Sequence, residues 1–191
     1  MPDFVKTRRD GAVFEVELDR PKANAIDLVT SREMGEVFRS FRDDAEARVA
    51  LVTTAGDKFF CAGWDLKAAA DGDPVDGDYG VGGFGGLQEL RGLNKPVIAA
   101  VNGMAVGGGF ELALACDVLI GSPNARFADT HARVGILPGW GLSQRLSRLL
   151  GPSRAKEISL TGNFIEAEQA CAWGLINRIV PEDELIAQCF A

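Results

Sequence analysis

One acidic residue lies inside an otherwise apolar stretch and is the first candidate for chemistry. Glu111 is flanked by Phe110 and by residues 112–115, which are all apolar or small. Three glycines, Gly107 to Gly109, precede it, and a helix that starts at such a turn has unpaired N–H groups. These amides and the positive helix end suit an anion or a developing oxyanion. A carboxylate in a dry pocket there can act as acid or base, whereas a Glu pointing outward through the apolar face is the weaker alternative.

A second glycine-containing turn, residues 61–65, can add another backbone donor. Two converging N–H groups stabilise a carbonyl that becomes an oxyanion, in acyl transfer or in enolate chemistry. The alternative is that both turns serve packing only, and the pattern leaves the two interpretations about even. Trp64 is either a core residue or a residue whose ring lies beside a ligand bound by the turn. Lys22 and Lys67 are the nearest basic residues and can meet phosphate, although solvated lysines are commoner.

His131 is the only histidine of the chain and lies in the polar segment 129–133. An imidazole titrates near neutrality and can move a proton, but a lone histidine in a loop is more often a surface residue. No second histidine and no cluster of ligands indicates a metal site. No Ser-His-Asp order with a nucleophile elbow is present, which disfavours a serine hydrolase.

The elements that must position these residues alternate between strands and helices, which predicts an α/β fold. Apolar or alternating runs predict strands at residues 12–18, 49–54, 97–101, 118–120, 126–128 and 175–180. Helical spacing predicts helices at residues 27–41, after the glycines 107–109, and at 143–150, 153–160 and 166–173, with a last one from Pro181. Asp27 or Thr30 is expected to cap the first of them. Residues 135–141 are expected to form a turn-rich loop.

Residues 70–86 differ in composition from the rest of the chain. They are rich in Asp and Gly and offer little that can pack, so we expect a mobile surface loop. Residues 80–85 match G-x-G-x-x-G, but the pattern follows an acidic loop instead of a strand and is therefore a decoy for a dinucleotide fingerprint. A helix is expected to begin at Leu87.

The totals exclude several classes of function. The 191 residues suit one domain, and the net charge of -7 argues against nucleic acid as a partner. The four cysteines lack C-x-x-C spacing, so reduced, mostly buried thiols are expected. The first residues lack the apolar core of a signal peptide, and no apolar run reaches membrane-spanning length. We therefore expect a cytoplasmic protein without a membrane partner.

Taken together, five segments resemble the enoyl-CoA hydratase/isomerase family, the crotonase superfamily. They are LDRPKANAID (18–27), FFCAGWDLK (59–67), KPVIAAVNGMAVGGGFELALACDVLI (95–120), ARFADTHARVGILPGWGLSQRL (125–146) and AWGLINRIVP (172–181). The resemblance implies a ClpP-like spiral of ββα units with flanking helices, spanning residues 1–191 as a single domain. It also implies homotrimers or hexamers, an acyl-CoA substrate, no cofactor beyond that coenzyme A, and a place in fatty-acid metabolism.

The resemblance also implies roles for particular residues. The amides of Trp64 and Gly108 would hold the thioester oxygen, and Glu111 falls on the first of the two catalytic glutamates of hydratases. Six further positions match stretches that line the coenzyme A site in the family: Ala23, Ala25, Ala62, Asp65, Leu66 and Lys67. Lys22, Gly107, Pro138 and Gly139 complete the candidate residues for binding the substrate or coenzyme A.

Three features depart from the family pattern. His131 occupies the place of the second glutamate; it can give and take a proton but does not reproduce a pair of carboxylates. Trp140 and Leu142 stand where small residues are usual, which predicts a reshaped or smaller acyl pocket. Members also usually continue past the equivalent of Val180 with several helices, so the C-terminal helical part is expected to be mostly absent here.

Three functions remain open at this point. The first is hydration of trans-2-enoyl-CoA to 3-hydroxyacyl-CoA, with Glu111 and His131 as catalytic residues. The second is another reaction through the same enolate, namely isomerisation, decarboxylation or thioester hydrolysis. The third is acyl-CoA binding without catalysis. Whether His131 faces Glu111 across a gap that fits one water bears on the choice.

Overall fold

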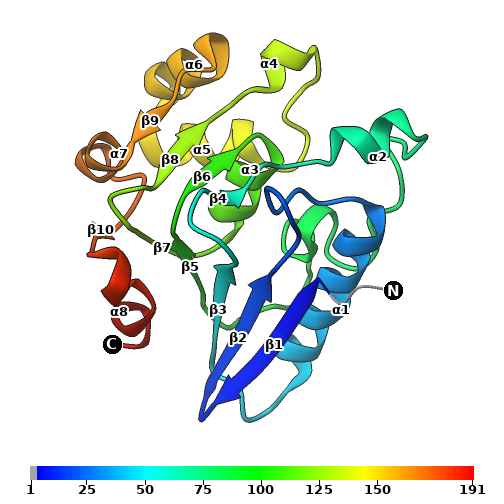
Figure 1. Cartoon of the computed structure of the whole chain (residues 1–191), viewed down its shortest axis with the longest axis vertical. Helices are drawn as coiled ribbons and strands as arrows, with labels where there is room; N and C mark the ends of the chain where they lie inside the picture. The colour runs from blue at the N-terminus through cyan, green and yellow to red at the C-terminus, as the bar shows by residue number, and fades with distance from the viewer. Residues whose placement is uncertain (1–3) are drawn as a thin grey trace.

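The computed structural model describes residues 4–191, and its strands form two sheets. The larger sheet contains, in spatial order, β1 (Val5–Asp10), β2 (Val13–Leu18), β3 (Val49–Thr54), β5 (Val97–Val101), β7 (Val118–Gly121) and β10 (Arg178–Ile179). The smaller one contains β4 (Phe59–Cys61), β6 (Met104–Val106), β8 (Arg126–Ala128) and β9 (Ile165–Glu166). Among the strand pairs within residues 4–191, only β1–β2 and β8–β9 are antiparallel. In Figure 1, β4, β6 and β8 lie above β1, β2 and β3.

Successive turns of the chain add one strand to each sheet. β3 and β4, then β5 and β6, then β7 and β8 place their first member in the larger sheet and their second in the smaller one. A helix follows each pair: α2 (Leu66–Ala70), α3 (Gly108–Ala115) and α4 (His131–Val134). This is the repeated ββα unit that the resemblance implies, and it brings the three strand-to-helix links to one edge of the smaller sheet.

The first helix packs as its spacing predicts. α1 (Leu28–Asp43) buries Met34, Phe38 and Phe41. Asp27 is its cap: the Thr30 amide donates to the Asp27 carboxylate at 2.7 Å. The last helices are α5 (Leu142–Leu150), α6 (Pro152–Thr161), α7 (Ala167–Trp173) and α8 (Leu185–Phe190), with short 3-10 turns at Phe84–Gly86 and Glu182–Glu184.

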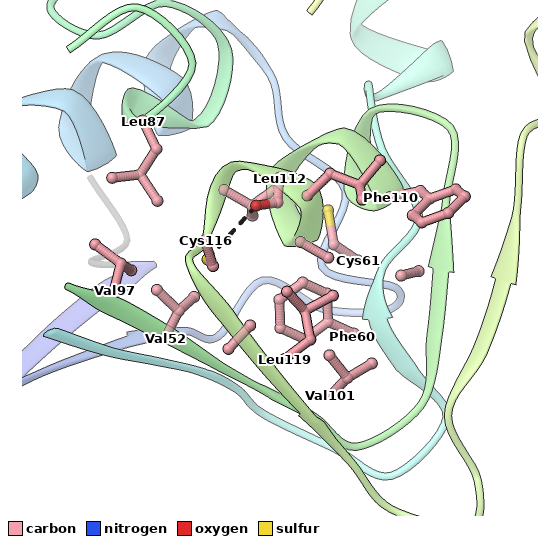
Figure 2. Close-up of a cluster of buried hydrophobic side chains, with 14 of the residues drawn as sticks. Val52, Phe60, Cys61, Leu87, Val97, Val101, Phe110, Leu112, Cys116 and Leu119 are labelled. Atoms are coloured by element: carbon pink, nitrogen blue, oxygen red, sulfur yellow. Dashed lines mark hydrogen bonds between the residues drawn. The ribbon is translucent and has the colours of Figure 1, made fainter. Parts of the chain in front are cut away.

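The main core lies between the sheets and the helices α1 and α3. Figure 2 shows part of it, where Phe60, Val101 and Leu119 meet Phe110 and Leu112 of the glycine-initiated helix. A smaller cluster covers the other face of the larger sheet, where Leu185 and Cys189 of α8 join buried residues of β3, β5 and β7. Because both faces of these parallel strands are covered, their sequences are continuously apolar.

Three expectations need correction. Residues 87–94 form no helix: the Glu89 amide donates to the Gly82 carbonyl at 2.8 Å, and Gly92 has a φ of +75°, so this stretch follows the glycine turns before it. The strand expected at 175–180 is reduced to Arg178–Ile179. The sequence patterns predict neither the strand β1 nor the short helix α4. β1 is almost wholly exposed and polar, so it lacks the apolar pattern that marks a strand.

The third correction concerns residues 70–86. The statement that little in this segment packs is wrong for its second half, because Tyr79 and Phe84 are buried. The Ser31 hydroxyl of α1 donates to the carbonyls of Tyr79 and Gly83, and it accepts from the Gly85 amide at 3.0 Å. No strand precedes the G-x-G-x-x-G pattern, as expected.

Candidate active site

The candidate residues lie at the carboxyl ends of three neighbouring strands. Trp64 follows β4, Glu111 lies in the first turn of α3 after β6, and His131 begins α4 after β8. β6 pairs with β4 on one side and with β8 on the other, both in parallel. Three links far apart in the sequence therefore meet at one edge, which is where α/β proteins usually bind ligands.

The two glycine turns are in direct backbone contact. A Cβ atom on Gly63 would lie 2.7 Å from the Val106 oxygen and 2.8 Å from the Gly108 nitrogen. A Cβ atom on Gly109 would lie 2.0 Å from the Cys61 oxygen. No side chain fits at either position, so the glycines are what allow the turns to approach each other.

Two amides of these turns remain outside the regular hydrogen bonding. In the backbone bridge between Ile26 and Trp64, the Ile26 amide donates to the Gly63 carbonyl at 2.8 Å and the Asp65 amide donates to the Ile26 carbonyl at 2.9 Å. The Trp64 amide takes no part in this bridge. Gly108 is the first residue of α3, where amides have no intrahelical acceptor. Both residues line one pocket of about 60 Å³. Each amide is therefore available to a ligand oxygen in that pocket.

Glu111 is fully buried and points into the site. Its Oε1 accepts from the amides of Trp140, at 2.8 Å, and Leu142, at 3.1 Å. Its Oε2 has no hydrogen bond within residues 4–191 and lies 3.4 Å from the His131 Nε2. The alternative of an outward-pointing glutamate is therefore wrong.

His131 is buried and faces Glu111, so it is not a surface residue. Its Nδ1 lies 2.6 Å from the Asp129 Oδ1. Burial would lower the pKa of His131, but the contact with Asp129 and the negative charges of Asp129 and Glu111 raise it to about 9. A water between Nε2 and Oε2 would need about twice a hydrogen-bond length, so the 3.4 Å gap holds none. A reacting water must lie beside this pair.

Asp129 is the member of the site that sequence reasoning missed. It stands two residues before His131, the position that matches the second glutamate of the family, yet its carboxylate is 1 % exposed and contacts the His131 ring. The His131 amide also donates to the same oxygen at 3.2 Å. An aspartate two residues before a histidine at a strand end is the signal that could have found it.

Aromatic side chains close the pocket on one side. The Trp140 ring stacks on Phe84, with centroids 4.0 Å apart and planes 6° apart, and Tyr79 meets it edge-on at 5.2 Å. A Cβ atom on Gly108 would lie 2.9 Å from the Phe84 ring and 3.1 Å from the Trp140 ring. Trp140 thus narrows the pocket, whereas Leu142 is a buried core residue.

The residues assigned to the coenzyme A site lie along one strip beside the pocket. The Ala62 amide donates to the Ala23 carbonyl at 3.0 Å, which aligns residues 23–26 with 62–65. Leu66 and Ala62 line the pocket with Gly107, while the side chains of Lys22 and Lys67 are exposed nearby in the chain. Pro138 and Gly139 lead to Trp140 without lining the pocket.

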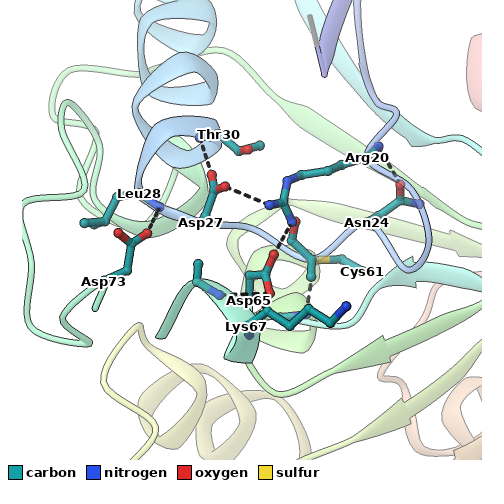
Figure 3. A network of polar contacts seen from close by, with 12 residues as sticks. Arg20, Asn24, Asp27, Leu28, Thr30, Cys61, Asp65, Lys67 and Asp73 are labelled. Atoms are coloured by element: carbon teal, nitrogen blue, oxygen red, sulfur yellow. Dashed lines mark hydrogen bonds and ion pairs between the residues drawn. The ribbon is translucent and has the colours of Figure 1, made fainter. Parts of the chain in front are cut away.

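Arg20 holds this strip together, as Figure 3 shows. Its guanidinium contacts the carboxylates of Asp65 at 2.6 Å and Asp27 at 2.7 Å, and it donates to the Ala25 carbonyl at 2.8 Å. Burial would raise the pKa of Asp65, but the hydrogen bonds from Arg20 and from two backbone amides lower it below its usual range. One cation thus ties together the end of β2, the cap of α1 and the cap of α2.

Residues 4–191 contain no group of three or more His, Cys, Asp or Glu side chains placed to hold a metal ion. None of the helices within that range is long and apolar enough to cross a membrane. The site thus offers hydrogen-bond donors, two carboxylates and one imidazole as its chemical groups.

Comparison with known proteins places this geometry in a family. The chain matches the family described as "Enoyl-CoA hydratase/isomerase" over residues 8–191. It is 54% identical over 186 residues to a carnitinyl-CoA dehydratase of Escherichia coli (strain K12), covering 97% of this chain and 71% of the relative. It is 58% identical over 176 residues to a carnitinyl-CoA dehydratase of Proteus mirabilis (strain HI4320), covering 92% and 67%.

Solved structures agree with the fold. The carnitinyl-CoA hydratase from Mycobacterium avium superposes with a TM-score of 0.92 at 36% identity, over 100% of this chain and 73% of that one. An enoyl-CoA hydratase from the same species superposes with a TM-score of 0.87 at 40% identity, over 98% and 78%. The match over nearly the whole chain, in sequence and in fold, shows that this chain belongs to the enoyl-CoA hydratase/isomerase family.

Proposed function

We propose that this protein is a hydro-lyase that adds water to, or removes it from, the C2–C3 bond of an acyl-CoA thioester. One observation carries the proposal: a buried carboxylate, Glu111, faces a buried imidazole, His131, across 3.4 Å beside two unused backbone amides. The family supports the same reaction, since its relatives include dehydratases and hydratases of acyl-CoA.

The proposed hydration begins with the thioester oxygen between the amides of Trp64 and Gly108. The Glu111 carboxylate takes a proton from a water as the water oxygen bonds to C3. The C2–C3 π electrons move toward the thioester oxygen, and the two amides stabilise the resulting enolate. The His131 imidazolium then donates its Nε2 proton to C2, which leaves the imidazole neutral.

The short distance between the two side chains allows the site to reset. Glu111 now carries the proton of the water and His131 lacks one, and their facing atoms are 3.4 Å apart. Transfer of that proton from Glu111 to His131 restores the starting state, so the sum of the steps is the addition of one water. Dehydration is the same sequence in reverse.

A direct assay tests the hydratase reaction. Loss of the conjugated thioester absorbance of crotonyl-CoA is followed with the wild-type protein and with Glu111→Gln. Turnover that depends on Glu111 supports the proposal. Binding of crotonyl-CoA by calorimetry without any turnover would favour acyl-CoA binding alone, and turnover with release of free coenzyme A thiol would indicate thioester hydrolysis instead.

A more specific substrate follows from the relatives. We propose carnitinyl-CoA, because two relatives at 54% and 58% identity are named carnitinyl-CoA dehydratases. Its acyl group ends in a quaternary ammonium, which aromatic faces attract, and Trp64 and Trp140 both line the pocket. Comparing kcat/KM for carnitinyl-CoA and the uncharged 3-hydroxybutyryl-CoA tests this: a preference for the uncharged thioester refutes it.

Several finer expectations stay predictions. The homotrimer or hexamer and the place in fatty-acid metabolism come from the resemblance. The cytoplasmic location and the contacts of coenzyme A with Lys22 and Lys67 are predictions from the residues themselves. Light scattering of the purified protein tests the assembly, and the KM for crotonyl-CoA of Lys22→Ala and Lys67→Ala tests the contacts.

A further inference from the structure

The His131 ring is held from both of its nitrogen atoms by buried carboxylates. Asp129 contacts Nδ1 at 2.6 Å and Glu111 lies 3.4 Å from Nε2. All three residues are at most 4 % exposed. The Asp129 oxygen that contacts the ring also accepts the His131 amide at 3.2 Å. The ring and its own backbone are therefore fixed to one carboxylate.

These two carboxylates are the charged groups that face the ring within residues 4–191. Glu111 comes from α3, and Asp129 comes from the link between β8 and α4. On α4 itself, Arg133 turns away and donates to the Thr161 carbonyl at the end of α6 at 3.3 Å. α6 also contributes the Ser159 hydroxyl, which hydrogen-bonds the Asp129 carboxylate. The other pocket residues near the ring are neutral.

Electrostatics favours one charge state for this arrangement. Two buried carboxylates beside a neutral imidazole would be two uncompensated anions, which is costly in a dry site. A protonated imidazole places one cation between them and leaves both ring N–H groups with an acceptor. A carboxylate at Nδ1 also fixes the ring orientation, as in other buried aspartate–histidine pairs.

We propose that Asp129 is the positioning residue of the site: it holds the His131 ring as an imidazolium whose Nε2–H points toward Glu111 and the pocket. The inference builds on the proposed function, in which His131 delivers that proton to C2. Asp129 does not touch the substrate in this scheme and acts only through His131. A second catalytic carboxylate would contact the substrate directly, whereas Asp129 orients the imidazolium that does so.

The ring can be observed without any assay of activity, because His131 is the only histidine of the chain. Its imidazole carbon and nitrogen resonances can therefore be titrated by NMR without ambiguity. We expect the wild-type ring to titrate with a midpoint of about 9. We expect Asp129→Asn to lower that midpoint by about 1–2 pH units, the usual effect of losing an adjacent carboxylate. Asp78→Asn is a matched control, since Asp78 is exposed and far along the chain.

The kinetic measurement distinguishes positioning from a merely structural role. In the wild type, kcat/KM for hydration should fall as the pH rises through about 9. In Asp129→Asn the midpoint of this fall in kcat/KM should move to lower pH by the same shift that NMR reports. The factor by which kcat/KM lies below that of the wild type should therefore grow as the pH rises. A structural role for Asp129 would lower the rate by the same factor at every pH.

Each outcome bears on one part of the proposal. A wild-type midpoint near 6.5, the ordinary value for histidine, overturns the inference even if Asp129→Asn does not fold. So does an unchanged midpoint in folded Asp129→Asn. If the NMR shifts occur as expected but no acyl-CoA is hydrated, the proposed function fails while the assignment of Asp129 holds.

Discussion

Glu111 has two separable duties, and its substitutions should reveal both. Its Oε1 accepts two backbone amides, those of Trp140 and Leu142, while its Oε2 faces His131. Glutamine keeps an oxygen for the two amides and removes the base. Alanine removes both. The two variants should therefore be equally inactive but differ in stability.

The difference can be worked out from the hydrogen bonds. Alanine leaves two part-buried or buried amides without an acceptor, at about 1–3 kcal/mol each, so Glu111→Ala should lose about 2–6 kcal/mol of unfolding free energy from this source alone. Glutamine at the same position should cost less than about 2 kcal/mol, because both donors keep a partner. Loss of a general base lowers kcat by about 10²–10⁴ in either variant.

Urea denaturation and the hydration assay measure the two quantities on the same preparations. If Glu111→Ala is as stable as Glu111→Gln, the carboxylate does not anchor the loop that carries Trp140, and the argument is wrong. If Glu111→Gln retains more than about a tenth of wild-type kcat, the carboxylate is not the base.

Three further predictions follow from the site and its supports. The pKa of His131 is raised to about 9, so its contribution to the unfolding free energy is complete below its unfolded pKa of about 6.5 and is lost as the pH rises through 9. The unfolding free energy of wild type minus that of His131→Gln should therefore shrink between pH 6 and 10. A difference that stays constant over this range contradicts the prediction. Arg20→Ala leaves two part-buried carboxylates without their cation and should raise the KM for crotonyl-CoA while costing about 1–3 kcal/mol of stability; an unchanged KM would show that the strip beside the pocket does not depend on it. Gly109→Ala places a methyl group 2.0 Å from the Cys61 carbonyl and should yield little folded protein, whereas a well-folded variant by circular dichroism would contradict the close approach of the two turns.

The parts of the fold that the sequence predicts are those whose signal is local. Residues 97–115 show a β-run, a glycine turn and an apolar helix with one acid, and Glu111 is buried as its neighbours indicate. Asp27 was one of two expected caps, and its side chain fills that role. Such features depend on neighbours within a few residues along the chain, so periodicity and residue type are enough.

The parts that it does not predict depend on distant partners. Phe84 lies among glycines and looks exposed, but it is buried because Trp140, 56 residues away, stacks on it. The role of Asp129 requires the backbone to bend after β8, so that a side chain two positions away reaches the His131 ring. β1 forms although most of its residues are exposed, because it completes the ladder of β2.

The winding of the chain has a consequence for how such a protein can change its chemistry. Each ββα turn delivers one component to the common edge: β4 leads to the Trp64 amide, β6 to Gly108 and Glu111, and β8 to Asp129 and His131. The strands supply buried core residues, whereas the links between strands and helices supply the candidate site residues. Variants confined to residues 129–134 would therefore change the groups that face Glu111 while the turns that carry the Trp64 and Gly108 amides stay unchanged, which makes this link the natural place to redirect the proposed activity in laboratory evolution.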